Sequence, residues 1–139
     1  MASYLDSDKI YVPYGGVGNS AATTATAATL TAADSGKVTI VTATSGTPTF
    51  TLPAAATAGL TFTFVNGHAS NEVLINVVTG DNIVGKTHGA QDATGIATAT
   101  STGIKNTAAT DVIGDFVTLV SGGGTTWYMT AVAGVWATQ

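Results

Sequence analysis

The sequence of 139 residues contains no cysteine and no arginine. Without cysteine the chain can form neither disulfide bonds nor thiolate metal sites. It carries four lysines against eight acidic residues, which gives a net charge of −4. Nucleic-acid affinity comes largely from lysine and arginine on phosphates, and the sequence has no basic cluster. We therefore expect no direct nucleic-acid partner.

Charge of either sign is scarce. Only 9% of residues are charged, against roughly 25% in an ordinary globular chain. Disorder is not the explanation, because 45% of residues are hydrophobic and the net charge is small. Threonine instead makes up roughly one residue in five, several-fold above average usage. We interpret this as a surface hidden by assembly or exposed on an extracellular particle; a threonine-rich soluble β domain is the alternative.

Long apolar runs are also missing. No stretch is long enough to span a bilayer as a helix, so we expect no membrane partner. The first ten residues contain Asp6 and Asp8 instead of a basic region followed by an apolar run. We therefore expect no signal peptide.

The chain length predicts one domain, with room for a terminal arm. Residues 1–28 differ from the rest, because they hold three of the four tyrosines and end in a tract of alanine and threonine. The apolar anchors of this segment are Tyr4, Ile10, Tyr11 and Tyr14. We interpret residues 1–28 as an extended arm, with a short strand at 9–12, that docks on a neighbour. Terminal disorder is the alternative.

Residues 29–139 have the pattern of a β domain. The clearest alternation is at residues 60–64, where Leu60, Phe62 and Phe64 share one face and two threonines the other. Further strands are predicted at 38–42, 49–52, 72–78, 83–84, 111–120 and 127–132. The last of these places Trp127, Met129 and Ala131 on one face and Tyr128, Thr130 and Val132 on the other.

Turn signals separate these strands, notably Asn66-Gly67 and the three glycines at 122–124. Residues 85–110 are weakly patterned and predict a long loop or short edge strands. No segment of ten residues has helical periodicity. The fold class predicted is all-β: a small antiparallel β-sandwich or barrel, jelly-roll or β-tulip-like, with an extended N-terminal arm.

Six phrases follow one another in a recurring order. They are TLTAADSGKVT (29–39), TFTLPAA (49–55), GLTFTFV (59–65), TGDNIVG (79–85), IGDFVTLVS (113–121) and TTWYMTAVAG (125–134). This order resembles the head decoration, or capsid cement, proteins of tailed bacteriophages. The resemblance covers roughly residues 29–134. Similar phrases occur in some tail-fibre modules.

The resemblance implies a structural virion protein on the outer capsid surface, assembled in the host cytoplasm. Such proteins bind the major capsid protein as homotrimers, often at three-fold or quasi-three-fold positions, and stabilise the shell. It implies no cofactor and no enzymatic activity. A receptor- or glycan-binding module of a tail or fibre is the alternative.

Other motifs give weak signals of chemistry. The glycines at 15–18 lack the following helix and lysine of a phosphate loop. His68, His88 and Asp81 have unrelated spacing, so loop polar residues are favoured over a metal site. Asp111 and Asp115 are better explained by turn chemistry than by calcium binding. No nucleophile elbow or paired carboxylates are present, so we expect no enzyme.

The aromatic residues near the C-terminus serve either a carbohydrate platform or the core and a trimer interface. Alternation predicts that Trp127 is buried and that Tyr128 lies at a contact. The residues predicted to contact a partner are Tyr4, Ile10, Tyr11, Tyr14, Tyr128 and Trp136. The tyrosines are chosen because aromatic side chains anchor protein interfaces.

Overall fold

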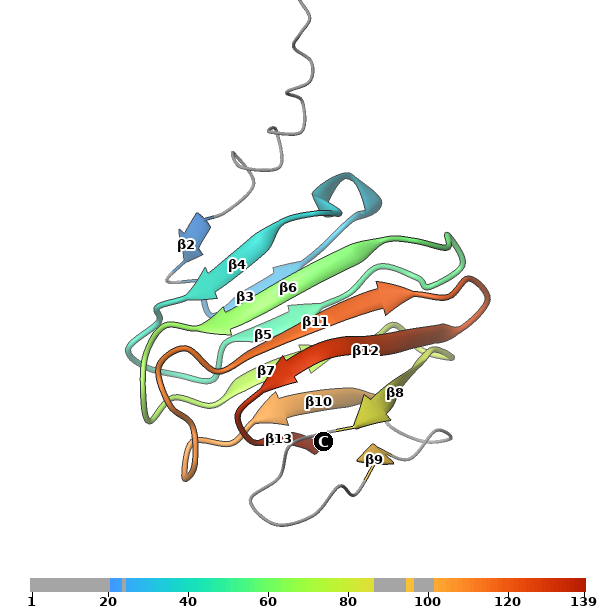
Figure 1. The fold of residues 1–139 in the computed structure, drawn as a ribbon. Coiled ribbons are helices and arrows are strands. Elements are labelled where there is room, and N and C mark those ends of the chain that lie inside the picture. The colour runs from blue at the N-terminus through green and yellow to red at the C-terminus, as the bar shows by residue number, and fades with distance from the viewer. Residues whose placement is uncertain (1–20, 24, 87–94, 97–101) are drawn as a thin grey trace, which may run out of the picture.

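The computed structural model describes residues 21–23, 25–86, 95–96 and 102–139. Two β-sheets face each other across one core (Figure 1). The five-stranded sheet has the order β13 (Trp136–Thr138), β10 (Gly103–Asn106), β7 (Val73–Asn76), β5 (Thr49–Thr51), β3 (Ala27–Thr29). The seven-stranded sheet has the order β2 (Ala21–Thr23), β4 (Val38–Val41), β6 (Thr61–Asn66), β11 (Phe116–Ser121), β12 (Thr126–Ala133), β8 (Asn82–Lys86), β9 (Gly95–Ile96).

The first half of the fold winds back and forth between the sheets. Strands β2, β4 and β6 lie parallel in one sheet, and β3, β5 and β7 lie parallel in the other. Each strand therefore crosses to the opposite sheet before its neighbour forms (Figure 1). The prediction of a β-sandwich is confirmed, but the sheets are mixed: five of the ten strand pairings are parallel and five antiparallel.

The antiparallel pairs each include a strand from the second half of the fold, β8 to β13. Strands β11 and β12 form a hairpin across the glycines at 122–124, as the sequence predicts, and β11 pairs with β6 on its other side. Strand β10 lies between β7 and β13. Within residues 85–110, where a long loop or short edge strands are predicted, the two-residue β9 is a short edge strand. Strand β10 corrects the prediction, because it is an interior strand whose Ile104 is completely buried.

The core contains the side chains that alternation assigns to one face. Leu60, Phe62 and Phe64 are at most 9% exposed, and Trp127 is fully buried. Aromatic rings connect the strands of the core, with centroids 5.3 Å apart for Phe50 and Phe64 and 5.6 Å apart for Phe62 and Trp127. Tilted pairs at this spacing add to the stabilisation from burial.

A β-bulge in the β11–β12 hairpin corrects the predicted faces of β12. Thr118 pairs with Ala131 and Leu119 with Met129, so Thr130 is an extra residue without a partner of its own. One extra residue reverses the alternation beyond it. Val132 consequently packs against the core, whereas Ala131 is exposed.

Two predicted boundaries also change. Strand β11 begins at Phe116, and not at Asp111, because residues 111–115 form a turn with Gly114 at φ +101°. The predicted arm, residues 1–28, overlaps strands β2 and β3, which pair with β4 and β5. The β-sandwich therefore includes part of the alanine–threonine tract, and the predicted strand at 9–12 lies outside the described residues.

Candidate partner-contact surface

The outer side of the seven-stranded sheet has no charged residue in its four central strands, β4, β6, β11 and β12. Pleating directs alternate side chains outward, opposite the core. On these strands the outward residues are Val38, Ile40, Thr61, Thr63, Val65, Phe116, Thr118, Val120, Tyr128, Ala131 and Ala133. We call this set the uncharged sheet face.

Register brings like residues of the uncharged sheet face side by side. Ile40, Val65 and Phe116 form one apolar row across three strands. Thr63 and Thr118 lie opposite each other, and their hydroxyl oxygens are 2.9 Å apart and hydrogen-bonded. The surface thus offers aliphatic contact area and hydroxyl groups but no charge. Such a surface binds by shape and hydrogen bonding instead of electrostatic steering.

Tyr128 is the large exposed side chain of the uncharged sheet face, with 48% of its surface accessible. Its ring lies against Gly122, where any Cβ atom would collide with it. Trp127, the preceding residue on the strand, points the other way and is fully buried. The sequence prediction of one buried and one exposed aromatic is therefore confirmed for this pair.

Trp136 does not belong to a contact surface. It is only 2% exposed, and its indole N–H donates a hydrogen bond to the carbonyl oxygen of Ala133 at 3.1 Å. A buried side chain has no surface to offer, so Trp136 is removed from the predicted contact set. Alternation in so short a C-terminal segment gave no signal of its inward direction. The other predicted contacts, Tyr4, Ile10, Tyr11 and Tyr14, lie outside the described residues.

A second exposed apolar group was not foreseen from sequence. Val112 and Ile113 are 62% and 64% exposed at the tip of the turn that precedes β11. The pattern at 111–120 had placed them in a strand. Two carboxylates stabilise this turn. Asp115 accepts the backbone N–H of Val112 at 3.0 Å, within the turn, and Asp111 accepts the backbone N–H of Ser70 at 3.0 Å, which connects it to the turn after β6.

These carboxylates belong to a group that we call the polar cluster: Asn66, Asn106 and Asp115, which are buried, and Asp111, which is half-buried. The Asn66 amide nitrogen donates to Asn106 Oδ1 at 2.7 Å and to Asp111 Oδ2 at 2.8 Å. The Asn106 amide nitrogen donates to Asp115 Oδ2 and to the carbonyl oxygen of Val135, both at 3.0 Å. Asn66 and Asn106 are at most 1% exposed.

The polar cluster connects parts of the fold through hydrogen bonds among its own members. Its members sit at the ends of β6 and β10 and in the turn before β11, so the cluster joins both sheets. Gly134 is also required there, because it has φ +88° and a Cβ atom would overlap the Asp115 carboxyl group. Asp115 accepts the backbone N–H of Val112 within its own turn, as the sequence predicts, whereas Asp111 accepts groups distant in the chain, from Asn66, Ser70 and Asn71. Within the described ranges, no group of three acidic, histidine or cysteine residues could hold a metal ion.

For Asp81, His68 and His88 the sequence favours loop roles over a metal site. The Asp81 carboxylate accepts the backbone N–H of Ala55 at 2.7 Å, which ties two loops together. His68 lies in the turn after β6, and His88 is outside the described residues. Asp81 therefore acts as a loop clamp in the described part of the chain.

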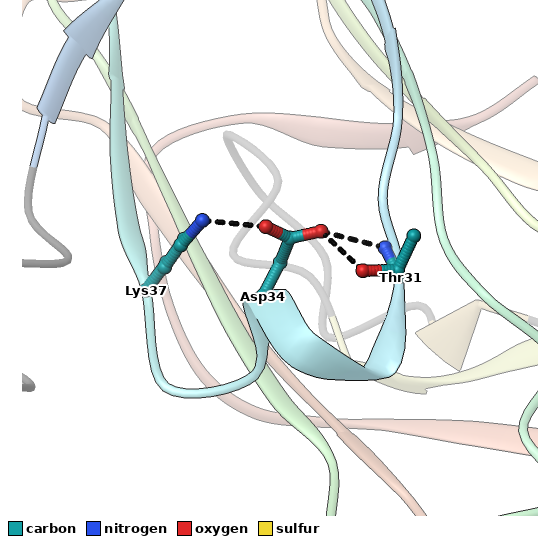
Figure 2. A network of polar contacts seen from close by, with 3 residues as sticks. All are labelled: Thr31, Asp34 and Lys37. Atoms are coloured by element: carbon teal, nitrogen blue, oxygen red, sulfur yellow. Dashed lines mark hydrogen bonds and ion pairs between the residues drawn. The ribbon is translucent and has the colours of Figure 1, made fainter.

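The phrase at 29–39 forms a local cap, shown in Figure 2. Asp34, in a 3₁₀ turn (η1, Ala32–Asp34), accepts from Lys37 Nζ at 2.5 Å, and from the hydroxyl and backbone N–H of Thr31 at 2.7 and 2.8 Å. The Lys37 bond and then the Thr31 bonds lower the pKa of Asp34 from 3.8 to about 2. These bonds fix the turn that leads into β4.

No protein-family model matches the chain, and no curated protein matches it. In the part of the chain that the structure describes, no helix has the length and apolar character required to cross a membrane. The candidate surface therefore rests on the residues themselves.

Proposed function

We propose that this chain is a structural virion protein that binds the outer surface of a tailed-phage capsid and stabilises the shell, as trimers at three-fold or quasi-three-fold positions. The observation that carries the proposal is the uncharged sheet face. It is a continuous surface of half-buried aliphatic and hydroxyl side chains with no charge in its central strands. The ordered phrases of residues 29–134 and the confirmed β-sandwich support the same function.

The mechanism is mechanical. Each copy contributes a modest binding energy across a seam between capsid subunits, and many copies on one shell multiply that energy. The relevant quantity is the rate at which the shell ruptures, since a filled shell fails irreversibly. The uncharged sheet face suits permanent burial because it has no charged group to desolvate. The segment before β2, with its three tyrosines, would add a second contact with the major capsid protein.

The experiment measures occupancy on heads assembled without this chain. Thr118→Lys places a charge at the centre of the uncharged sheet face and should reduce the bound copies per head strongly. Thr51→Lys is the matched control, because Thr51 is a half-buried threonine on an interior strand of the other sheet. Circular dichroism first checks that both variants fold. Equal occupancy for Thr118→Lys and wild type would contradict a role for this face.

A deletion of residues 1–14 tests the arm separately. It should lower occupancy while leaving the β-sandwich folded, because the first described strand starts at Ala21. Normal occupancy after the deletion would contradict an arm contact without affecting the role of the sheet face. Light scattering of the free protein measures whether trimers already exist in solution.

The second candidate is a receptor- or glycan-binding module on a tail or fibre. The favouring observation is Tyr128, an exposed aromatic ring held against Gly122, because such rings stack on sugars. Copy number separates the two functions. Many copies on the head support decoration, whereas a few copies on the tail, with glycan binding lost in Tyr128→Ala, support adhesion.

A further inference from the structure

Asn66-Gly67 is the only asparagine–glycine pair in the sequence. In a flexible chain, the backbone nitrogen of the residue after asparagine attacks the side-chain carbonyl carbon, Cγ. Glycine makes this attack easiest, since it has no Cβ atom and the widest conformational freedom. Asparagine is accordingly one of the thermolabile residues of proteins. The pair is therefore the most reactive asparagine that this sequence contains.

The fold engages both reacting groups in hydrogen bonds. The Gly67 backbone N–H donates to the carbonyl oxygen of Val41 at 2.8 Å. The Asn66 amide nitrogen has two acceptors, Asn106 and Asp111, and its oxygen accepts the backbone N–H of His68 at 3.0 Å. Asn66 is also only 1% exposed, which keeps out the water that later steps need.

We propose that Asn66 is a modification site that the folded state protects and that unfolding exposes to irreversible deamidation. In the unfolded chain, the new bond forms between the Gly67 nitrogen and Asn66 Cγ. The bond from Cγ to the amide nitrogen breaks, and ammonia leaves with the proton from Gly67. Water then opens the five-membered succinimide to give aspartate or isoaspartate. No oxidant or reductant takes part.

The product no longer fits the polar cluster. Where the Asn66 amide nitrogen donates to Asn106 and Asp111, aspartate presents an oxygen to the same two acceptors. A third carboxylate also joins the half-buried Asp111 and the buried Asp115, at the buried position 66, where unpaired like charges are costly. Isoaspartate further adds a backbone atom at the end of β6, where Asn66 pairs with Val41.

The consequence is a one-way loss of refolding. Many proteins have an operational stability set by a rate because the unfolded chain is modified faster than it refolds. Each time this chain unfolds, Asn66 can deamidate, and a deamidated chain refolds to a smaller extent. This goes beyond the proposed virion role, since it concerns the chain before and after assembly alike.

The first experiment compares deamidation in buffer and in guanidinium chloride at the same temperature and mildly alkaline pH. Peptide mass spectrometry follows residue 66, with Asn71, Asn76, Asn82 and Asn106 as internal references. In denaturant, Asn66 should react faster than every reference. In the native chain it should react more slowly by more than about tenfold, because reaction requires opening of the cluster. Equal rates in the two conditions, or no excess at Asn66 in denaturant, would overturn the proposal.

Two variants test the chemistry and its effect on folding. Gly67→Ala, examined only in denaturant, should slow the reaction at Asn66; an unchanged rate would contradict attack by the following nitrogen. Asn66→Asp imitates the product and should refold to a smaller extent than Asn76→Asp, whose site is half-buried on the outer side of β7. Refolding of Asn66→Asp equal to wild type would overturn the claimed one-way loss.

Discussion

The polar cluster and the uncharged sheet face use polar atoms in opposite ways. In the cluster, amides and carboxylates of two sheets and a turn are buried and hydrogen-bonded to one another. On the sheet face, threonine and aliphatic side chains are only half-buried, and the hydroxyls of Thr61, Thr63 and Thr118 each take part in one side-chain hydrogen bond, to Gly59 or to each other. Polar groups in the cluster therefore maintain the fold, whereas those on the face are available to another molecule.

The largest loss of folding stability is expected when a core side chain beneath the uncharged sheet face is truncated. Trp127→Ala removes a fully buried ring that contacts Phe62. Large-to-small changes of this kind cost about 3–5 kcal/mol, so the variant should be unfolded or nearly so. Denaturant titration followed by circular dichroism measures the loss. A folded variant that had lost only a binding partner would show that the inner side of β12 is not the core.

Removing one member of the polar cluster should lower the free energy of unfolding by a somewhat smaller amount. Asn106→Ala removes three hydrogen bonds, to Asn66, to Asp115 and to the Val135 carbonyl, although Asn66 still donates to Asp111 and Asp115 still accepts from Val112. A hydrogen bond contributes about 1 kcal/mol net, so we expect a total of about 3 kcal/mol. Asn76→Ala is the control, since that side chain bonds only at the exposed surface. If both variants lost equal stability in chemical unfolding, the cluster would not be the special region described above.

The uncharged sheet face should tolerate truncation without loss of stability. Tyr128→Ala removes a ring that is half exposed and lies on the side of β12 opposite Trp127. Surface changes of this kind usually stay within about 0.5 kcal/mol. We expect unfolding midpoints close to wild type and a weaker interaction with the partner. A destabilisation that approached the effect of Asn106→Ala would make this face a structural element too.

The smallest loss of folding stability is expected at the cap formed by Asp34, and this loss depends on pH. Because the folded pKa is lowered to about 2 from 3.8, the carboxylate stabilises the fold above about pH 4 and this contribution is lost as pH falls through about 2. The pair is partly exposed to solvent, which screens its charges, so Asp34→Asn should cost at most about 1 kcal/mol at neutral pH. Unfolding of both proteins across this pH range should show the difference between them shrinking at the acidic end. A constant difference would show that charge is irrelevant to the cap.

Much of the site lay beyond sequence reasoning. The outward direction of Tyr128 could be predicted, because strict alternation places it opposite a buried tryptophan. Val112 and Ile113 were missed, since their apolar pattern looks like a strand and only the Asp111 and Asp115 bonds reveal a turn. Trp136 was misplaced because β13 forms only by pairing with β10, a strand that is itself weakly patterned.

The sequence alone determined the faces and turns of the strong strands. Leu60, Phe62 and Phe64 had to share a side because the pleat repeats every two residues, and the glycines at 122–124 had to turn. Tertiary structure decided which strands pair, that half of the pairings are parallel, and that the bulge at Thr130 reverses β12. Alternation is a local property of a strand, whereas its partner depends on contacts between residues distant in the chain. The same distinction explains why the uncharged sheet face, assembled from four separate strands, exists only in the folded molecule.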